Sequence, residues 1–258
     1  RLYAENPATG FLPSSGKLRH MRLPSTDAGV RIDSGVRQGD EVSIFYDPMI
    51  AKLIVHGVNR EQARLKLQSA LKSVQIAGPA TNTGFLRAIA GHPAFADGDV
   101  DTGFIERHQN VLLPDNLNAP ANDSVLALAC LGVMCHREHL AALTANPDDP
   151  YSPWMNTRGW RINSDGHETL QFVSNGIELK IQITHLAGCT WLGLPGGEIS
   201  ATATLRDGAL TAILGGQTIT AGIDISGSRI TIMLAGDAHI IDLHDQLIDA
   251  ELDEGGGG

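Results

Sequence analysis

The fold of the first half of this chain is decided by one stretch, Glu41-Val-Ser-Ile-Phe-Tyr-Asp-Pro-Met-Ile-Ala-Lys-Leu-Ile-Val-His-Gly57. It contains two apolar runs that are typical of strands, and they are interrupted at Asp47-Pro48. A proline ring fixes φ and removes an amide donor, so the chain has to turn there. The stretch therefore predicts a strand, a corner and a second strand.

Shorter runs of the same kind precede this stretch. Arg1–Ala4 and Val30–Ser34 alternate as strands do, and Lys17–Leu23 is another extended piece. Turn residues gather at Pro13–Gly16 and Arg37–Asp40. We expect the first 57 residues to form several short antiparallel strands.

The spacing of apolar residues then becomes helical. Asn59, with a glutamine three residues later, has the pattern of a capping box and predicts a helix to about Lys72. A strand at Val74–Ile76 follows. Thr81 is the expected N-cap of a second helix, which ends before Pro93.

The composition describes a globular protein that buries a core. The chain has 258 residues, of which 42% are apolar and 19% charged, and this length favours two domains. Its net charge of −10 gives no attraction for nucleic acid or anionic lipid. Three cysteines are too few for a disulfide framework and favour a reducing compartment inside a cell. We expect neither nucleic acid nor membrane as a partner.

Both ends of the sequence indicate an excerpt of a longer polypeptide. The chain opens on Arg1 within an alternating strand pattern and without an initiator methionine. It closes on Gly255–Gly258, which is typical of the start of a linker.

The second half predicts a helix enclosed by a barrel. Val125–Cys135 is apolar or small on all sides, and at about eleven residues it is too short to span a bilayer. Something else must therefore surround it. Strand-like runs separated by turn signals recur about every ten residues, which favours a barrel or sandwich. These runs are Gly159–Asn163, Thr169–Ser174, Ile177–Leu186, Cys189–Leu192, Ile199–Leu205, Ala209–Leu214, Gln217–Ala221, Arg229–Leu234 and Ala238–Leu243.

Five motifs follow one another in the first half: Arg1–Pro7, Phe11–Gly16, Tyr46–Leu53, Thr81–Leu86 and Asp101–Glu106. In order and spacing they resemble the C-terminal subdomain of biotin carboxylase. The resemblance implies that Arg1 lies beside bicarbonate and the ureido group of biotin, as a catalytic residue. A guanidinium suits this role because it stays charged and binds anions through a bidentate fork. The resemblance also makes Arg31 a candidate for a dimer interface; the alternative is a solvated strand charge.

The same resemblance implies the cofactors of a biotin-dependent ligase. These are biotin, ATP, Mg or Mn, and bicarbonate. The implied phosphate loop, metal-binding glutamates and bicarbonate-positioning base belong upstream of Arg1, and biotin belongs on a later domain. We therefore expect the fragment alone to be inactive.

The second half resembles the BT domain of acyl-CoA carboxylase α-subunits. The loop with Ser152-Pro153-Trp154 and the following Thr157–Arg161 is most similar to the 3-methylcrotonyl-CoA and geranyl-CoA branch. In that family the loop hooks onto the carboxyltransferase β-subunit, so the resemblance implies a hetero-oligomer. An exposed aromatic side chain is a plausible interface anchor, although packing on the barrel end is the alternative. The implied docking residues are Pro150, Tyr151, Pro153 and Trp154.

The predicted fold class is α+β, with an antiparallel sheet plus helices followed by an antiparallel β-barrel around a central helix. We expect a carboxylase subdomain at residues 1–112, a linker at 113–121 and a BT domain at 122–254. We expect the BT domain to consist of a helix at 122–145, a hook loop at 146–158 and a barrel at 159–250. Residues 255–258 are expected to begin the linker to the chain's own biotinyl domain. The expected location is the bacterial cytoplasm or the mitochondrial matrix.

Two alternative functions stay open from the sequence. The fragment could serve only as an assembly module, or it could come from a propionyl-CoA, pyruvate or urea carboxylase. The resemblance implies that the pocket for the acyl substrate belongs to the β-subunit.

Two further patterns favour structural roles. Cys130 and Cys135 lie about 140° apart around a helix, and only His136 and His139 share a face, so we expect no zinc site. The glycine-rich Gly193–Gly197 lies between strands and predicts a turn, because no helix follows to bind phosphate.

Overall fold

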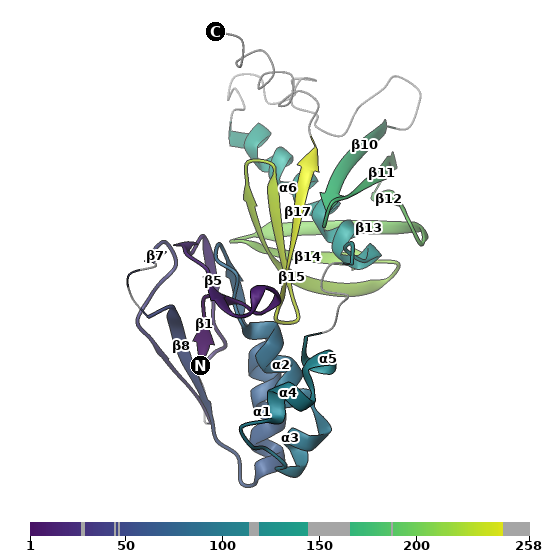
Figure 1. Cartoon of the computed structure of the whole chain (residues 1–258). Coiled ribbons are helices and arrows are strands. Elements are labelled where there is room, and N and C mark those ends of the chain that lie inside the picture. Colours follow the sequence, from purple (N-terminus) through teal and green to yellow (C-terminus); the bar gives the residue numbers. More distant parts are fainter. Residues whose placement is uncertain are drawn as a thin grey trace. The chain divides into compact units, whose positions relative to one another are not determined.

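The computed structural model describes residues 1–26, 29–43, 45, 47–113, 119–143, 166–186 and 188–244. The chain forms two compact units (Figure 1). The first comprises Arg1–Ala119 with Met233–Ala238, and the second comprises Pro120–Ile232 with His239–Gly258.

Short antiparallel strands form the first unit, as the sequence predicts. A three-stranded sheet has the order β1 (Leu2–Tyr3), β8 (Met49–Val55) and β6 (Val30–Ser34). The predicted corner lies between β7 and β8, which belong to different sheets. The short η1 helix covers Pro7–Thr9. The remaining strands pair as β2 (Glu5–Asn6) with β3 (Leu12–Pro13), β4 (Gly16–Lys17) with β7 (Glu41–Val42), and β5 (His20–Arg22) with β9 (Gln75–Ala77).

The first helix of this unit begins where the sequence predicts, and the second does not. Asn59 caps α1 (Arg60–Lys72), because its Oδ1 accepts the Gln62 amide at 2.9 Å. The prediction of Thr81 as the next N-cap is wrong, because Asn82 occupies that position. The helices that follow α1 are α2 (Thr83–Gly91), α3 (Pro93–Asp97), α4 (Phe104–Arg107) and α5 (Gln109–Leu112).

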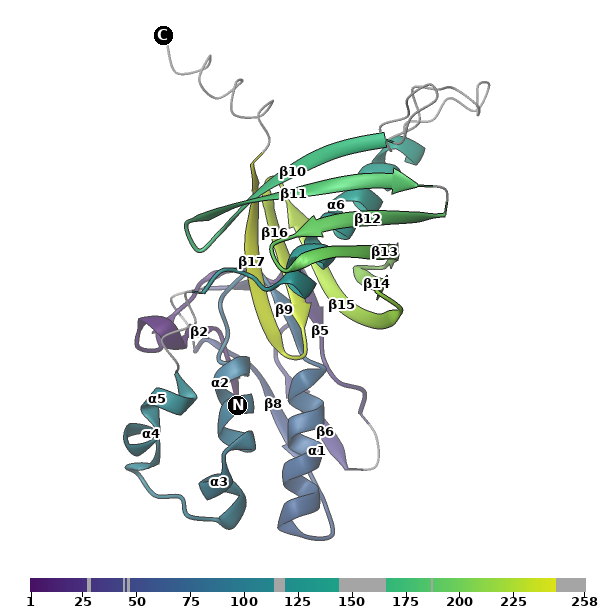
Figure 2. The ribbon, with the colours of Figure 1, turned by 90° about the vertical axis from the view of Figure 1, so that its right-hand side faces the viewer.

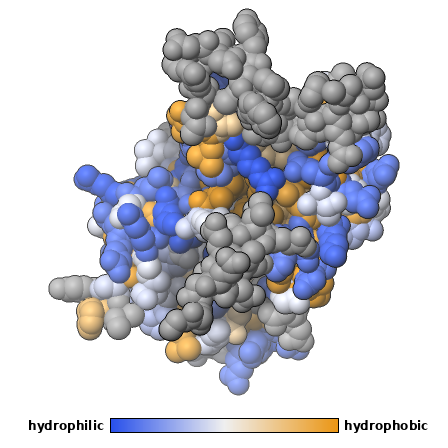
Figure 3. All heavy atoms as spheres, turned by 90° about the horizontal axis from the view of Figure 1, so that it is seen from above, coloured by the Kyte–Doolittle hydropathy of each residue, from blue (hydrophilic) through white to orange (hydrophobic). Residues whose placement is uncertain are grey.

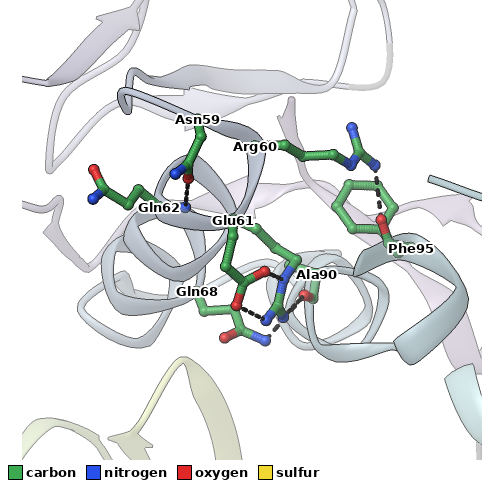
Figure 4. A network of polar contacts seen from close by, with 8 residues as sticks. Asn59, Arg60, Glu61, Gln62, Gln68, Ala90 and Phe95 are labelled. Atoms are coloured by element: carbon green, nitrogen blue, oxygen red, sulfur yellow. Dashed lines mark hydrogen bonds and ion pairs between the residues drawn. The ribbon is translucent and has the colours of Figure 1, made fainter. Parts of the chain in front are cut away.

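Side chains of α1 bind the main chain of the following helices (Figure 4). Arg64 and Gln68 each donate to the carbonyl of Ala90 at 3.0 Å, and Arg60 donates to the carbonyl of Phe95 at 2.7 Å. These bonds fix the end of α2 on α1. The core beneath the sheet joins apolar residues of strands and helices, among them Leu2, Leu18, Ile50, Leu71 and Ile76.

The second unit is a closed antiparallel barrel around α6 (Asp123–Leu143), as predicted. Figures 1 and 2 show α6 among the strands. Gly132 lies where a Cβ would meet Ile223 Cδ1 at 2.1 Å, so the helix approaches the wall closely there. The strands are β10 (Gly166–Ser174), β11 (Ile177–Leu186), β12 (Cys189–Leu194), β13 (Gly197–Arg206), β14 (Ala209–Leu214), β15 (Gln217–Ser226), β16 (Arg229–Leu234) and β17 (Asp237–His244).

The central helix is longer than its apolar run. It has 21 residues, and by length and composition it could cross a membrane. However, its residues Val125–Val133 are buried inside the unit, and 56% of its most apolar window is buried. The core helix of a soluble protein has the same properties. The predicted strand Gly159–Asn163 lies outside the described residues.

Candidate functional site

Arg1 is an exposed residue at the start of a buried strand. Leu2 and Ala4 are buried in the core, and β1 pairs with β8 through Leu2 opposite Ala51 and Tyr3 opposite Met49. The Arg1 guanidinium has no ion-pair partner among the residues that the structure describes. A guanidinium binds anions through parallel N–H donors, and the pairing of β1 with β8 fixes the main chain that follows Arg1.

The corner at Asp47-Pro48 helps to hold this strand. The Ala4 amide donates to the Pro48 carbonyl at 2.8 Å, and Asp47 Oδ1 accepts the Met49 amide at 3.0 Å. The Ser14 amide donates in turn to the carbonyl of Ala4 at 2.8 Å. The stretch that decides the fold therefore also holds Ala4, three residues after Arg1.

Arg31 lies on the opposite edge of the same sheet. Arg1 precedes β1, whereas Arg31 is on β6, with β8 between the two strands. Its guanidinium donates to both oxygens of Asp33, at 2.9 and 3.1 Å, and both side chains are exposed. This hydrogen bonding raises the pKa of Arg31 and lowers the pKa of Asp33. The structure does not bring the two arginines into one site.

The implied docking residues Pro150, Tyr151, Pro153 and Trp154 lie outside the described residues, as does the whole hook loop 146–158. The elements on either side of it are described, because α6 ends at Leu143 and β10 begins at Gly166.

Seen from above in Figure 3, hydrophobic residues reach the surface among hydrophilic ones. On α6, Leu140 and Leu143 are exposed at 48% and 70%.

A polar cluster that the sequence did not reveal joins α6 to two barrel strands. Glu168 accepts from Arg137 Nη1 at 3.2 Å and lies 3.1 Å from His185 Nε2. The His185 side chain is only 8% exposed, and its Nδ1 has no partner among the described residues. Burial, with a smaller effect of the Glu168 charge, raises the pKa of the Cys130 thiol. The inward positions of Glu168 and His185 in the alternating strand pattern were the only available signal.

The cysteine and histidine pattern and the glycine-rich segment were the two remaining patterns in the sequence. Within the described ranges, no three His, Cys, Asp or Glu side chains gather as metal ligands. The Gly193–Gly197 segment connects β12 to β13, and the Gly196 amide donates to Asp123 Oδ2 at 2.9 Å. The glycine-rich segment therefore bonds the start of the central helix.

Two family models match separate parts of the chain. Residues 1–107 match the biotin carboxylase C-terminal domain. The first half therefore belongs to the biotin carboxylase family of domains. Residues 122–246 match the BT domain of the methylcrotonyl-CoA carboxylase α-subunit. The chain thus carries the two consecutive domains of a biotin-dependent carboxylase α-subunit, with a BT domain of the methylcrotonyl-CoA carboxylase type.

Individual relatives are similar over different lengths. The mitochondrial methylcrotonoyl-CoA carboxylase subunit alpha of Dictyostelium discoideum is 38% identical over 216 residues, covering 83% of this chain and 30% of that protein. The mitochondrial propionyl-CoA carboxylase alpha chain of Caenorhabditis elegans is 43% identical over 131 residues, covering 50% of this chain and 18% of that protein. The chain therefore spans less than a third of these curated relatives.

Among solved structures, one similar protein is the biotin carboxylase domain of a thermophilic 2-oxoglutarate carboxylase bound to bicarbonate. It is 35% identical, with a TM-score of 0.42, and the match covers 43% of this chain and 25% of that one.

Proposed function

We propose that this chain is the middle part of the α-subunit of a biotin-dependent acyl-CoA carboxylase, a ligase that carboxylates biotin with ATP and bicarbonate. The observation that carries this proposal is the match of residues 1–107 to the biotin carboxylase C-terminal domain, whose first motif here opens on Arg1. In the full-length α-subunit, we expect ATP hydrolysis that requires both biotin and bicarbonate. An equal rate of ATP hydrolysis with and without biotin would overturn the proposal.

Arg1 is the residue of this chain that would contact the reacting groups. Its guanidinium offers parallel N–H donors, which would hold bicarbonate and stabilise negative charge on the ureido oxygen of biotin. Bound biotin supplies the ureido nitrogen that takes up the carboxyl group. The groups that would hold ATP and Mg or Mn are expected outside these 258 residues, so Arg1 is the contribution of this chain to the site.

The proposed acyl substrate is 3-methylcrotonyl-CoA. The extent of similarity supports this choice, since the methylcrotonoyl-CoA carboxylase relative aligns over 83% of the chain and the propionyl-CoA carboxylase relative over 50%. Geranyl-CoA is the second candidate, favoured by the sequence of residues 152–161. Carboxylation of each acyl-CoA by the reconstituted holoenzyme distinguishes them, and a preference for propionyl-CoA would contradict both.

The proposed partner is a carboxyltransferase β-subunit, bound through the barrel domain in a hetero-oligomer that also includes the chain's own biotinyl domain. The BT-domain match supports this role. Tyr151 and Trp154 are the proposed anchors, because aromatic residues concentrate binding energy at interfaces. Trp154→Ala in the full-length α-subunit should weaken capture of the β-subunit at least tenfold, whereas the exposed Trp191→Ala should not. Equal capture by both variants would contradict the assignment.

Narrower proposals follow from the same family match. Arg31 remains a candidate for an interface between carboxylase domains, and Arg31→Glu should shift the full-length protein to a smaller species in sedimentation if it lies there. A fragment of residues 122–254 that captures the β-subunit without hydrolysing ATP would identify the second domain as an assembly module. The domain limits near residues 112 and 122 and a mitochondrial or cytoplasmic location belong to this proposal as well.

A further inference from the structure

Asn82 is a buried polar residue at a helix N-cap, but its side chain does not cap the helix. It occupies the N-cap position of α2 and is 6% exposed, yet its side chain makes no hydrogen bond to that helix. An asparagine at this position normally accepts an amide of the first helical turn. The side chain must therefore have partners elsewhere.

Those partners are the first residues of the chain. Asn82 Oδ1 accepts the Tyr3 amide at 2.9 Å, and Asn82 Nδ2 donates to the Arg1 carbonyl at 3.3 Å. The Asn82 amide donates to the Tyr3 carbonyl at 3.2 Å. One residue thus supplies three hydrogen bonds to the segment that carries Arg1.

These bonds lie on the side of β1 that no strand covers. In the sheet order β1-β8-β6, β1 is an edge strand of two residues and pairs only with β8 among the described strands. Among the described residues, Asn82 supplies the hydrogen-bond partners of main-chain groups on this outer edge. Asn82 takes the place of a neighbouring strand there.

Asparagine is suited to this task by its chemistry. Its amide combines an acceptor with two donors on one short group, which matches an amide on one side and a carbonyl on the other. Aspartate has the same shape but offers no donor to the Arg1 carbonyl when ionised. Alanine has neither group. The two replacements therefore remove different parts of the contact.

The support for Asn82 is itself anchored. Thr81 and Thr83 join their hydroxyls at 3.0 Å, and the Ala80 amide donates to Ser14 Oγ at 2.9 Å. The far end of α2 is bound to α1 through the carbonyl of Ala90. The contact to β1 therefore starts from a segment that is fixed on both sides.

We propose that Asn82 is a positioning residue for biotin carboxylation, which holds the main chain of Arg1 so that the guanidinium meets bicarbonate and biotin. This inference rests on the proposed function of Arg1. A small displacement of a reacting group can lower a rate by on the order of 100-fold. Loss of the Asn82 contacts should therefore affect turnover more than substrate binding.

The test uses the full-length α-subunit with free biotin, ATP and bicarbonate. Asn82→Asp and Asn82→Ala should lower kcat for biotin-dependent ATP hydrolysis by on the order of 10-fold to 100-fold, with KM for ATP within twofold of the wild type. Asn59→Ala is the matched control, because Asn59 also occupies a helix N-cap in this unit but bonds only its own helix among the described residues. Its kcat should stay within twofold.

Two outcomes would overturn the inference. One is wild-type kcat in Asn82→Asp, and the other is an equal loss in Asn59→Ala, which would indicate general destabilisation. If Asn82→Ala does not fold, Asn82→Asp carries the test, because it keeps the shape and the Tyr3 contact. Arg1→Lys is measured in parallel. Wild-type ATP hydrolysis that does not depend on biotin would refute the proposed function, and an active Arg1→Lys would refute the role of Arg1. An inactive Arg1→Lys beside a fully active Asn82→Asp would refute only the role of Asn82.

Discussion

The two units differ in what holds their strands together. Every described strand of the first unit except β8 has five residues or fewer, whereas the barrel strands have six to ten. In the first unit, polar side chains bond the main chain of strands, as Asn82 does at β1 and Asp47 at the start of β8. In the barrel, continuous ladders surround a buried apolar helix. We infer that both units have an apolar core, but that strand pairing in the first unit depends more on individual side-chain hydrogen bonds than it does in the barrel.

The largest effect is therefore expected in the barrel core. Leu128 on α6 is fully buried, and Leu128→Ala should lower the free energy of unfolding by about 2–5 kcal/mol through lost burial and the cavity left behind. Tryptophan fluorescence during urea unfolding reports this half selectively, since Trp154, Trp160 and Trp191 all lie within it. The control Ile213→Ala, at a site 47% exposed, should change little. Equal losses of unfolding free energy in Leu128→Ala and Ile213→Ala would contradict the claim that the barrel depends on its packed core.

The polar cluster inside the barrel should have an intermediate effect. Glu168→Gln removes the charge that Arg137 and His185 share, and we expect a loss of about 1–2 kcal/mol in the same unfolding experiment. Asp242→Asn breaks an exposed pair with Arg229 and should cost about 0–1 kcal/mol. A larger loss of unfolding free energy in Asp242→Asn than in Glu168→Gln would contradict a stabilising role of the cluster.

In the first unit, removal of one helix cap should cost about 1 kcal/mol. Asn59→Ala deletes the acceptor of the Gln62 amide, and caps of this kind contribute roughly 0.5–2 kcal/mol. Hydrogen exchange of the Gln62 amide should become faster. Gln62→Ala keeps the cap, because the bond uses the main chain of that residue, and its stability should be almost unchanged. Unaltered exchange in Asn59→Ala would refute the cap.

The smallest effect is expected at the exposed Arg31–Asp33 pair. The Arg31 bond holds the pKa of Asp33 below its ordinary value, so its stabilisation is present above that ordinary pKa and is lost as pH falls through the lowered one. An NMR titration should find this lowered pKa, and it should rise towards the ordinary value in Arg31→Ala. High salt should reduce the shift because the pair is exposed. Identical titrations in both proteins would contradict the assignment.

Much of the barrel could be predicted from sequence because local turn chemistry sets its strands. The bounds of Ile177–Leu186, Ala209–Leu214 and Arg229–Leu234 match the prediction. Asn175-Gly176 and Asp207-Gly208 have positive φ at both residues, as tight hairpin turns require. Such turns involve neighbouring residues only, so the sequence reveals them directly.

Contacts between distant residues could not be predicted in the same way. Thr81 was a reasonable cap by composition, but Asn82 takes the cap position while its side chain binds residues about 80 positions earlier. The cluster of Arg137, Glu168 and His185 likewise depends on how the barrel closes around α6. The family resemblance, and not residue spacing, indicated Arg1 as the candidate site.

The most direct test of the central claim is the effect of Arg1→Lys on biotin-dependent ATP hydrolysis by the full-length α-subunit. Lysine keeps the charge but loses the bidentate fork, so kcat should fall by on the order of 100-fold. Arg22→Lys, at another exposed arginine of the same unit, should retain activity within twofold. Wild-type turnover in Arg1→Lys would contradict the claim that this unit holds Arg1 for biotin carboxylation.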